Sequence, residues 1–196
     1  MSASTETPLS ARKLGLALLV WTIPSAASGI FITFSVNHAP QIGMIGLAIL
    51  TLGTAAARGW SIWTVVTLGA VWRWVNGLIV AVSVLAGIVS IVSLTQSVSL
   101  GLLVMTIAIW AALVAVCDAV MAFRISLPQL ARDLRVMTFA SGMLAVVEIS
   151  FPLSSVYAVG ILGAYGIITA VYLAIAGMSF RFDSTASTNP KGKNIT

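Results

Sequence analysis

The stretch that decides the fold of this chain is Leu100–Phe123, which reads LGLLVMTIAIWAALVAVCDAVMAF. It is almost entirely apolar, and its one charged residue is Asp118. An α-helix rises 1.5 Å per residue, so a run of this length crosses the ~30 Å hydrocarbon core of a bilayer. The stretch therefore predicts a transmembrane helix.

The composition of the whole chain agrees with this interpretation. Of its 196 residues, 59% are hydrophobic and 8% are charged, whereas roughly 25% of the residues of a soluble domain are charged. A single soluble core of this size has no room for so much apolar surface. These proportions exclude a soluble globular protein, a disordered chain and a disulfide scaffold.

Working outward from Leu100–Phe123, charges, prolines and short polar loops divide the chain into apolar runs. Six runs predict transmembrane helices, at residues 14–34, 42–57, 74–94, 100–123, 136–151 and 156–180. None alternates with a period of two, which excludes the strands of a membrane β-barrel. We predict an all-α, polytopic membrane helix bundle of six transmembrane helices, arranged as three helical hairpins. One transmembrane domain, 14–181, then lies between a polar N-terminal segment, 1–13, and a disordered tail, 182–196.

The segment 58–73 leaves two interpretations open. It contains Arg58 and Arg73, and the apolar run between them is too short to cross a membrane. Its tryptophans suit the headgroup zone of a bilayer, so the segment can form an interfacial helix. Alternatively, it extends the second or the third span.

The distribution of basic residues predicts the orientation. In the six-span arrangement all ten Lys and Arg lie on one side of the membrane. They are Arg12, Lys13, Arg58, Arg73, Arg124, Arg132, Arg135, Arg181, Lys191 and Lys193. By the positive-inside rule both termini face the cytoplasm, and the protein is a multi-pass protein of the cell membrane. The net charge of +5 is therefore a topology signal, and we predict no nucleic-acid partner.

Three short stretches near the C-terminal end carry a resemblance to a known family. They are Ser141–Leu144 (SGML), the dipeptide Phe151-Pro152, and Gly160–Ile167 (GILGAYGI). With them, residues 70–181 resemble the HdeD-like acid-resistance integral membrane proteins, most clearly from residue 134 onward. The resemblance implies six spans built as three helix pairs and a role in protecting the cell at low pH. It supplies no catalytic residue.

Two carboxylates lie inside predicted spans, where a charge is costly and usually has a partner. Asp118 has candidate partners in Arg73 and Asn76, near the cytoplasmic start of the third span. Glu148 has no nearby base in the sequence, so water, Ser150, Ser154 or Ser155 must solvate it, or protonation must keep it neutral. One interpretation makes Asp118 a structural ion pair and Glu148 a surface group, and the other makes both part of a proton relay.

Small residues and missing motifs complete the predictions. Gly160, Gly163 and Gly166 recur every three residues, which predicts close helix packing in the last span. Cys117 and His38 are the only residues of their kinds, which excludes the common histidine-based catalytic sites and His/Cys zinc sites.

We predict a non-enzymatic protein without a cofactor or a bound metal. Its expected role is an HdeD-like one in acid or stress tolerance or envelope integrity. The alternatives are a small transporter or channel for protons or a solute, and an accessory subunit of a larger membrane complex. The expected partners are the lipid bilayer and either further copies of the chain or other membrane subunits.

Overall fold

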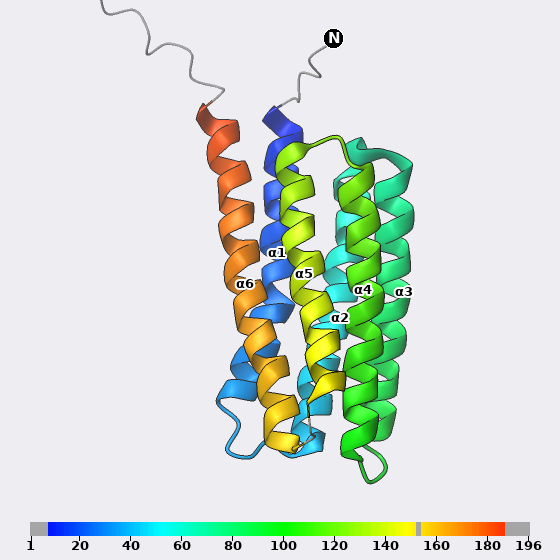
Figure 1. The fold of residues 1–196 in the computed structure, drawn as a ribbon. Coiled ribbons are helices and arrows are strands. Elements are labelled where there is room, and N and C mark those ends of the chain that lie inside the picture. The colour runs from blue at the N-terminus through cyan, green and yellow to red at the C-terminus, as the bar shows by residue number, and fades with distance from the viewer. Residues whose placement is uncertain (1–7, 152–153, 187–196) are drawn as a thin grey trace, which may run out of the picture.

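The computed structural model describes residues 8–151 and 154–186, and within these ranges the chain is helical without any β-strand. The elements are α1 Pro8–Thr33, α2 Pro40–Thr64, the short 3-10 helix η1 Val66–Leu68, α3 Gly69–Ser93, α4 Leu100–Arg124, α5 Pro128–Ser150 and α6 Ser155–Ala186. The predicted all-α bundle is confirmed. The six α-helices run alternately up and down, and α1 begins at the end of the bundle where α6 finishes (Figure 1). Pro152, Lys191, Lys193 and most of the predicted disordered tail lie outside the described residues.

Five of these helical segments are long and apolar enough to cross a membrane: Ala11–Thr33, Pro40–Thr64, Val66–Ser93, Leu100–Arg124 and Ser155–Phe182. The remaining helix, α5, is more polar because it carries Arg132, Asp133, Arg135 and Glu148. It nevertheless lies alongside the others over most of the bundle's length (Figure 1). These helices are consistent with an integral membrane protein.

The segment 58–73 extends its neighbouring helices and forms no interfacial helix of its own. α2 continues through Arg58 to Thr64, a turn of 3-10 helix follows, and α3 begins at Gly69. The chain reverses at Gly69, whose φ of 79° is accessible to glycine at little cost. Arg58 therefore lies inside a helix and does not mark its end.

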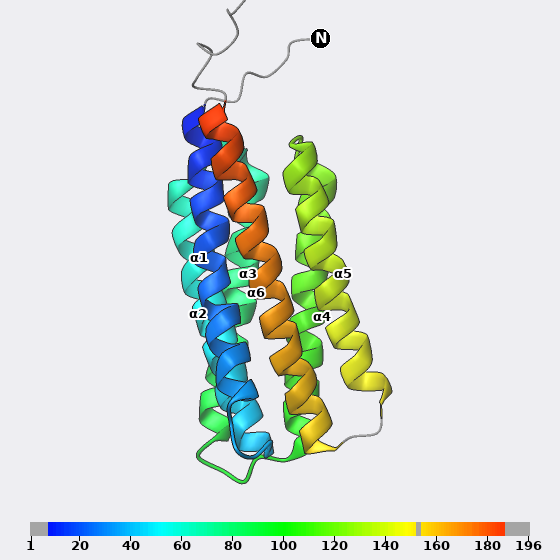
Figure 2. The ribbon, with the colours of Figure 1, turned by 90° about the vertical axis from the view of Figure 1, so that its left-hand side faces the viewer.

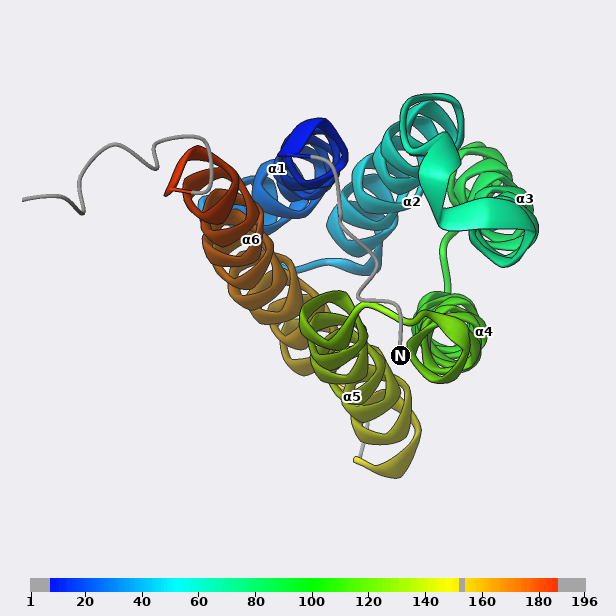
Figure 3. The same ribbon diagram turned by 90° about the horizontal axis from the view of Figure 1, so that it is seen from above.

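The helices form a ring in which the first and last are neighbours (Figure 3). The closest contacts join α1 to α6, α4 to α5 and α2 to α3, whereas α5 and α6 touch at few points. The prediction of three consecutive hairpins is therefore wrong for the last pair. α6 leans against α1, and α5 stays with α4 (Figure 2).

Glycines explain why α6 packs on α1. A Cβ placed on Gly166 would lie 2.9 Å from the backbone nitrogen of Gly29, and a Cβ on Gly15 would lie 2.7 Å from the carbonyl oxygen of Gly177. At such distances the two backbones touch, which is how small residues hold helices together in lipid. Gly163 also faces α1, but a Cβ on Gly160 would meet no described atom within 4 Å. Within the described chain Gly160 thus lacks the close helix contact that the sequence predicts.

The outer surface of the bundle is apolar. Large exposed side chains on α3 include Trp74, Leu78 and Leu85. Even α5 has an exposed apolar stripe, formed by Val136, Phe139, Met143, Val146 and Ile149. Residues three and four apart share one face of a helix, so the polar groups of α5 occupy a different face from this stripe.

Candidate functional site: two buried carboxyl groups

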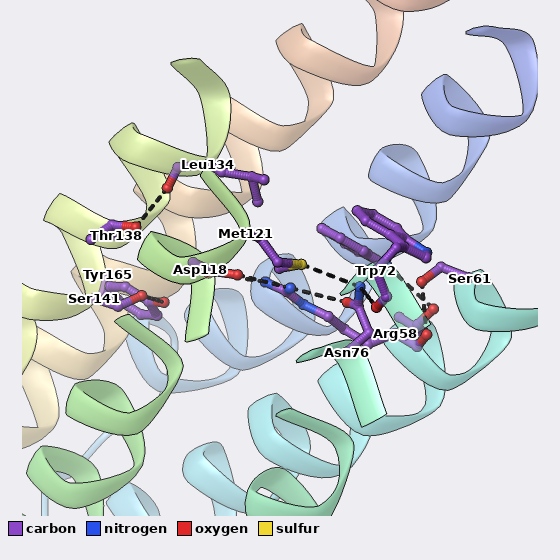
Figure 4. Close-up of polar contacts among 12 residues, drawn as sticks. Arg58, Ser61, Trp72, Asn76, Asp118, Met121, Leu134, Thr138, Ser141 and Tyr165 are labelled. Carbon is purple, nitrogen blue, oxygen red and sulfur yellow. Dashed lines mark hydrogen bonds and ion pairs between the residues drawn. The ribbon is translucent and has the colours of Figure 1, made fainter. Parts of the chain in front are cut away.

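A buried ion pair joins α2 to α4 across the interior of the bundle. Arg58 Nη1 lies 2.9 Å from Asp118 Oδ1, and Arg58 Nη2 donates a hydrogen bond of 3.1 Å to Asp118 Oδ2. The side chains are 4% and 0% exposed. Figure 4 shows the two side chains pointing toward each other from opposite helices. The Asp118 carboxylate is thus held by a guanidinium that reaches both of its oxygens.

Asn76 on α3 extends this pair into a network. Its Oδ1 accepts a hydrogen bond of 3.2 Å from Arg58 Nη1, and its Nδ2 donates one of 2.9 Å to the carbonyl oxygen of Trp72. The same Nδ2 lies 3.4 Å from Met121 Sδ. Residues on three helices, α2, α3 and α4, are therefore linked through one guanidinium (Figure 4).

The aromatic ring of Trp21 covers one face of the guanidinium. Arg58 Cζ lies 4.1 Å from the ring centroid of Trp21 on α1. Trp21 stacks on Trp72, with centroids 5.8 Å apart, and its Nε1 donates a hydrogen bond of 3.3 Å to Ala57 O. A desolvated cation over a tryptophan face gains about 2 kcal/mol. The positive charge is therefore compensated both by an anion and by the π-system.

The local sequence explains why an arginine points inward here. The buried positions of α2 recur at helical spacing and include Leu47, Thr51, Ala55, Arg58 and Ser61. Arg58 belongs to this inward face, six residues before α2 ends, which places it ~9 Å from that end of the helix. The partner of Asp118 is thus Arg58 on α2 and not Arg73, which is exposed at the start of α3.

A small cavity of about 30 Å³ adjoins the ion pair. Its lining includes Arg58 and Trp21 on one side and Trp110 and Tyr165 on another. A cavity needs roughly 10–15 Å³ to hold one water molecule, so this space accommodates only a few atoms. Tyr165 Oη and Ser141 Oγ are 2.9 Å apart, which links α6 to α5 beside it.

Glu148 is the second buried carboxyl group, near the opposite end of the bundle. It is 3% exposed, and its Oε1 has no hydrogen-bond partner in the described residues. The interpretation of Glu148 as an exposed surface group is therefore wrong. Among the serines expected to solvate it, Ser150 is exposed, and Ser154 bonds instead to the backbone of Tyr157.

Glu148 shares the inward face of α5 with two other polar residues. Asp133, Ser141 and Glu148 are spaced eight and seven residues apart, and all three are buried. Asp133 Oδ1 accepts a hydrogen bond of 2.8 Å from Tyr172 on α6. α5 thus presents polar groups to the interior at three levels, near both ends and near its middle.

Sequence reasoning named Asp118, Glu148 and Asn76 but missed Arg58, Trp21, Asp133 and Tyr165. One signal for Arg58 was available: the apolar run 42–57 is too short to span a membrane unless the helix continues through the arginine. Within the described residues, no three His, Cys, Asp or Glu side chains lie close enough to hold a metal ion. Comparisons with protein-family models, curated proteins and solved structures find no match.

Proposed function

We propose that the chain is a six-span protein of the cytoplasmic membrane with both termini in the cytoplasm. The arrangement of α5 supports the sixth span. Its Arg132, Asp133 and Arg135 lie in its first two turns, and its outward stripe from Val136 to Ile149 is apolar. Burial of Ser141 and Glu148 in the bundle interior removes them from lipid. The low mean hydropathy of α5 is then compatible with a membrane-crossing helix.

The positions of the basic residues support the orientation. In the described chain, Arg12, Lys13, Arg73, Arg124, Arg132, Arg135 and Arg181 belong to helix ends on the same side of the bundle, where α1 starts and α6 finishes. Topology reporters fused at residues 38, 97 and 154 should report a location outside the cytoplasm. Reporters fused at residues 128 and 190 should report a location in the cytoplasm. A fusion at 190 that is active outside would contradict the six-span topology.

We further propose a non-enzymatic role in tolerance of acid or other envelope stress, as the HdeD-like resemblance implies. The observation that carries this proposal is the closure of the interior. Solute transporters commonly have interrupted helices around a midplane binding site, whereas the six α-helices here run unbroken and the cavity beside Arg58 is about 30 Å³. A closed interior of this kind is suited to stabilising the helix bundle rather than to conducting a solute.

The test is survival of a deletion strain under acid, osmotic and drug stress, with the wild-type gene restored as the positive control. We expect reduced survival under at least one stress and full restoration by the wild-type gene. The Arg73→Gln variant is a second complementation control. Because this exposed arginine lies outside the buried network, the variant gene should restore survival as the wild-type gene does. Equal survival of the deletion and parent strains under every stress would refute the proposed role.

Proton translocation is a second candidate, and the burial of Glu148 favours it. Its carboxyl oxygen has no partner in the described chain and lies in line with Ser141 and Asp133 on one helix face. Proton pathways use groups of this kind. Purified protein in liposomes loaded with a pH-sensitive dye tests this function. Flux that Glu148→Gln abolishes and Glu148→Asp retains would support translocation, and absence of flux above empty liposomes would exclude it.

A further inference from the structure

A groove between α5 and α6 lies at the basic end of the bundle, away from the buried ion pair. Its volume is about 750 Å³, and it is lined by Pro128, Gln129, Arg132, Arg135, Ser179 and Phe182. Ligand pockets commonly enclose about 300–1,000 Å³, so this groove has room for a headgroup-sized molecule. Nothing in the stress-tolerance proposal uses it.

The groove exists because α6 is drawn away from α5. The glycine contacts of Gly15 with Gly177 and of Gly29 with Gly166 fix α6 against α1. Figure 3 shows the end of α6 displaced from the start of α5 toward α1. The opening is therefore a consequence of the packing that closes the ring.

The charged side chains that line the groove are both arginines. Arg132 and Arg135 are both exposed and lie three residues apart on one helix face. Neither has a carboxylate within ion-pair distance in the described part of the chain. Asp133 lies between them in sequence, but it is buried and accepts a hydrogen bond from Tyr172. Among the described residues the groove thus offers two guanidinium groups without an ion-pair partner, and such groups match a phosphate well.

The surroundings of the groove distinguish a lipid from a soluble anion. Phe182, at the rim, is 71% exposed, and Val136 and Phe139 on α5 continue the apolar surface toward the middle of the bundle. A phospholipid can place its phosphate on the arginines and its acyl chains along these side chains. Basic pockets between helices at the cytoplasmic side are known to suit anionic headgroups. We propose that the groove binds the headgroup of an anionic phospholipid.

The test measures binding of phosphatidylglycerol and phosphatidylcholine to the purified full-length protein by native mass spectrometry. We expect preferential binding of phosphatidylglycerol and a loss of roughly tenfold or more in its apparent affinity for the Arg132→Gln/Arg135→Gln variant. The matched control, Lys13→Gln/Arg73→Gln, removes the same charge from the same end of the bundle without touching the groove. It should retain binding.

Two further measurements distinguish the effect of charge from that of groove shape, and binding of lipid from binding of free phosphate. Ser179→Trp keeps both arginines but fills the groove, and it should also reduce phosphatidylglycerol binding. Excess glycerol phosphate should not displace the lipid. Equal binding of the two lipids, unchanged binding by the double arginine variant, an equal loss in the control variant, or displacement by glycerol phosphate would each overturn the proposal. Because none of these measurements involves stress survival, the two proposals fail independently.

Discussion

Asp118 and Glu148 are buried acids on neighbouring helices, yet their surroundings differ completely. Asp118 meets a guanidinium from α2 at 2.9 Å, whereas no described cation lies within ion-pair distance of Glu148. In the sequence both are single acids inside apolar runs. The free-energy cost of burying an acid therefore depends on the partner that another helix supplies.

The largest expected effect comes from removing the cation of the paired site. Arg58→Met leaves Asp118 buried without its counter-charge and leaves Asn76 Oδ1 without its donor. Breaking a buried pair in this way costs about 3–5 kcal/mol. The free energy of unfolding in mixed detergent–SDS micelles measures the loss. A loss below about 1 kcal/mol would show that water reaches Asp118 and that the two acids are less different than the structure indicates.

Replacing both charges should cost less than replacing either one. In Arg58→Met/Asp118→Leu no charge is left without a partner, and buried pairs replaced by apolar residues are often neutral in stability. The remaining defect is Asn76 Oδ1, whose lost hydrogen bond costs about 1–3 kcal/mol. The same unfolding measurement on the two single variants and the double variant completes a mutant cycle. Strict additivity would show that the two side chains do not interact.

At the unpaired site, we expect no loss of stability when the acid is neutralised. Glu148→Gln keeps the shape of the side chain and removes a charge that no described group compensates, so the free energy of unfolding should stay level or rise by about 1 kcal/mol. Glu148→Asp serves as the charge-preserving control, and its free energy of unfolding should not rise. A loss comparable to that of Arg58→Met would mean that Glu148 has a strong partner after all.

The smallest effect is expected for Arg73, which sequence reasoning placed beside Asp118. It is exposed at the start of α3, and exposed substitutions usually change stability by no more than about 0.5 kcal/mol. Arg73→Gln should therefore leave the unfolding free energy nearly unchanged and should add independently to Asp118→Asn. Coupling between these two variants, measured in the same micelles, would restore the original assignment.

Arg58 and Arg73 explain why the sequence predicted the helices better than the site. Hydropathy identifies Leu100–Phe123 almost to the residue, because the observed helix is Leu100–Arg124. The same criterion treats any arginine after an apolar run as a helix end, so it stopped the second span at Ala57. The observed helix continues to Thr64, and Arg58 inside it pairs with Asp118, which is distant in sequence. Contacts between distant helices leave no local pattern, and Trp21 and Tyr165 were missed for the same reason.

Helix α5 shows the same limit at a boundary. Its span was predicted from Val136, after the last of the clustered charges, whereas the helix begins at Pro128. Proline is favourable in the first turn of a helix. Pro128 therefore indicates the start of α5 better than the charged residues that follow it. The polar residues of its inward face lower the mean hydropathy but leave its exposed stripe from Val136 to Ile149 apolar.

The contact between α1 and α6 joins segments that are far apart in the sequence, so the ribosome makes α6 long after α1. When α1 has just been synthesised, its glycines, Gly15 and Gly29, have no α6 to pack against. At the contact between the two helices, a Cβ added to a glycine would lie 2.7 Å to 2.9 Å from the opposite backbone. This close backbone contact forms only after Ser155–Ala186 has been synthesised. Because contacts distant in sequence form late, the ring is completed only after α6 has been synthesised. A nascent chain stopped after α5 therefore presents an unfilled glycine face to its surroundings.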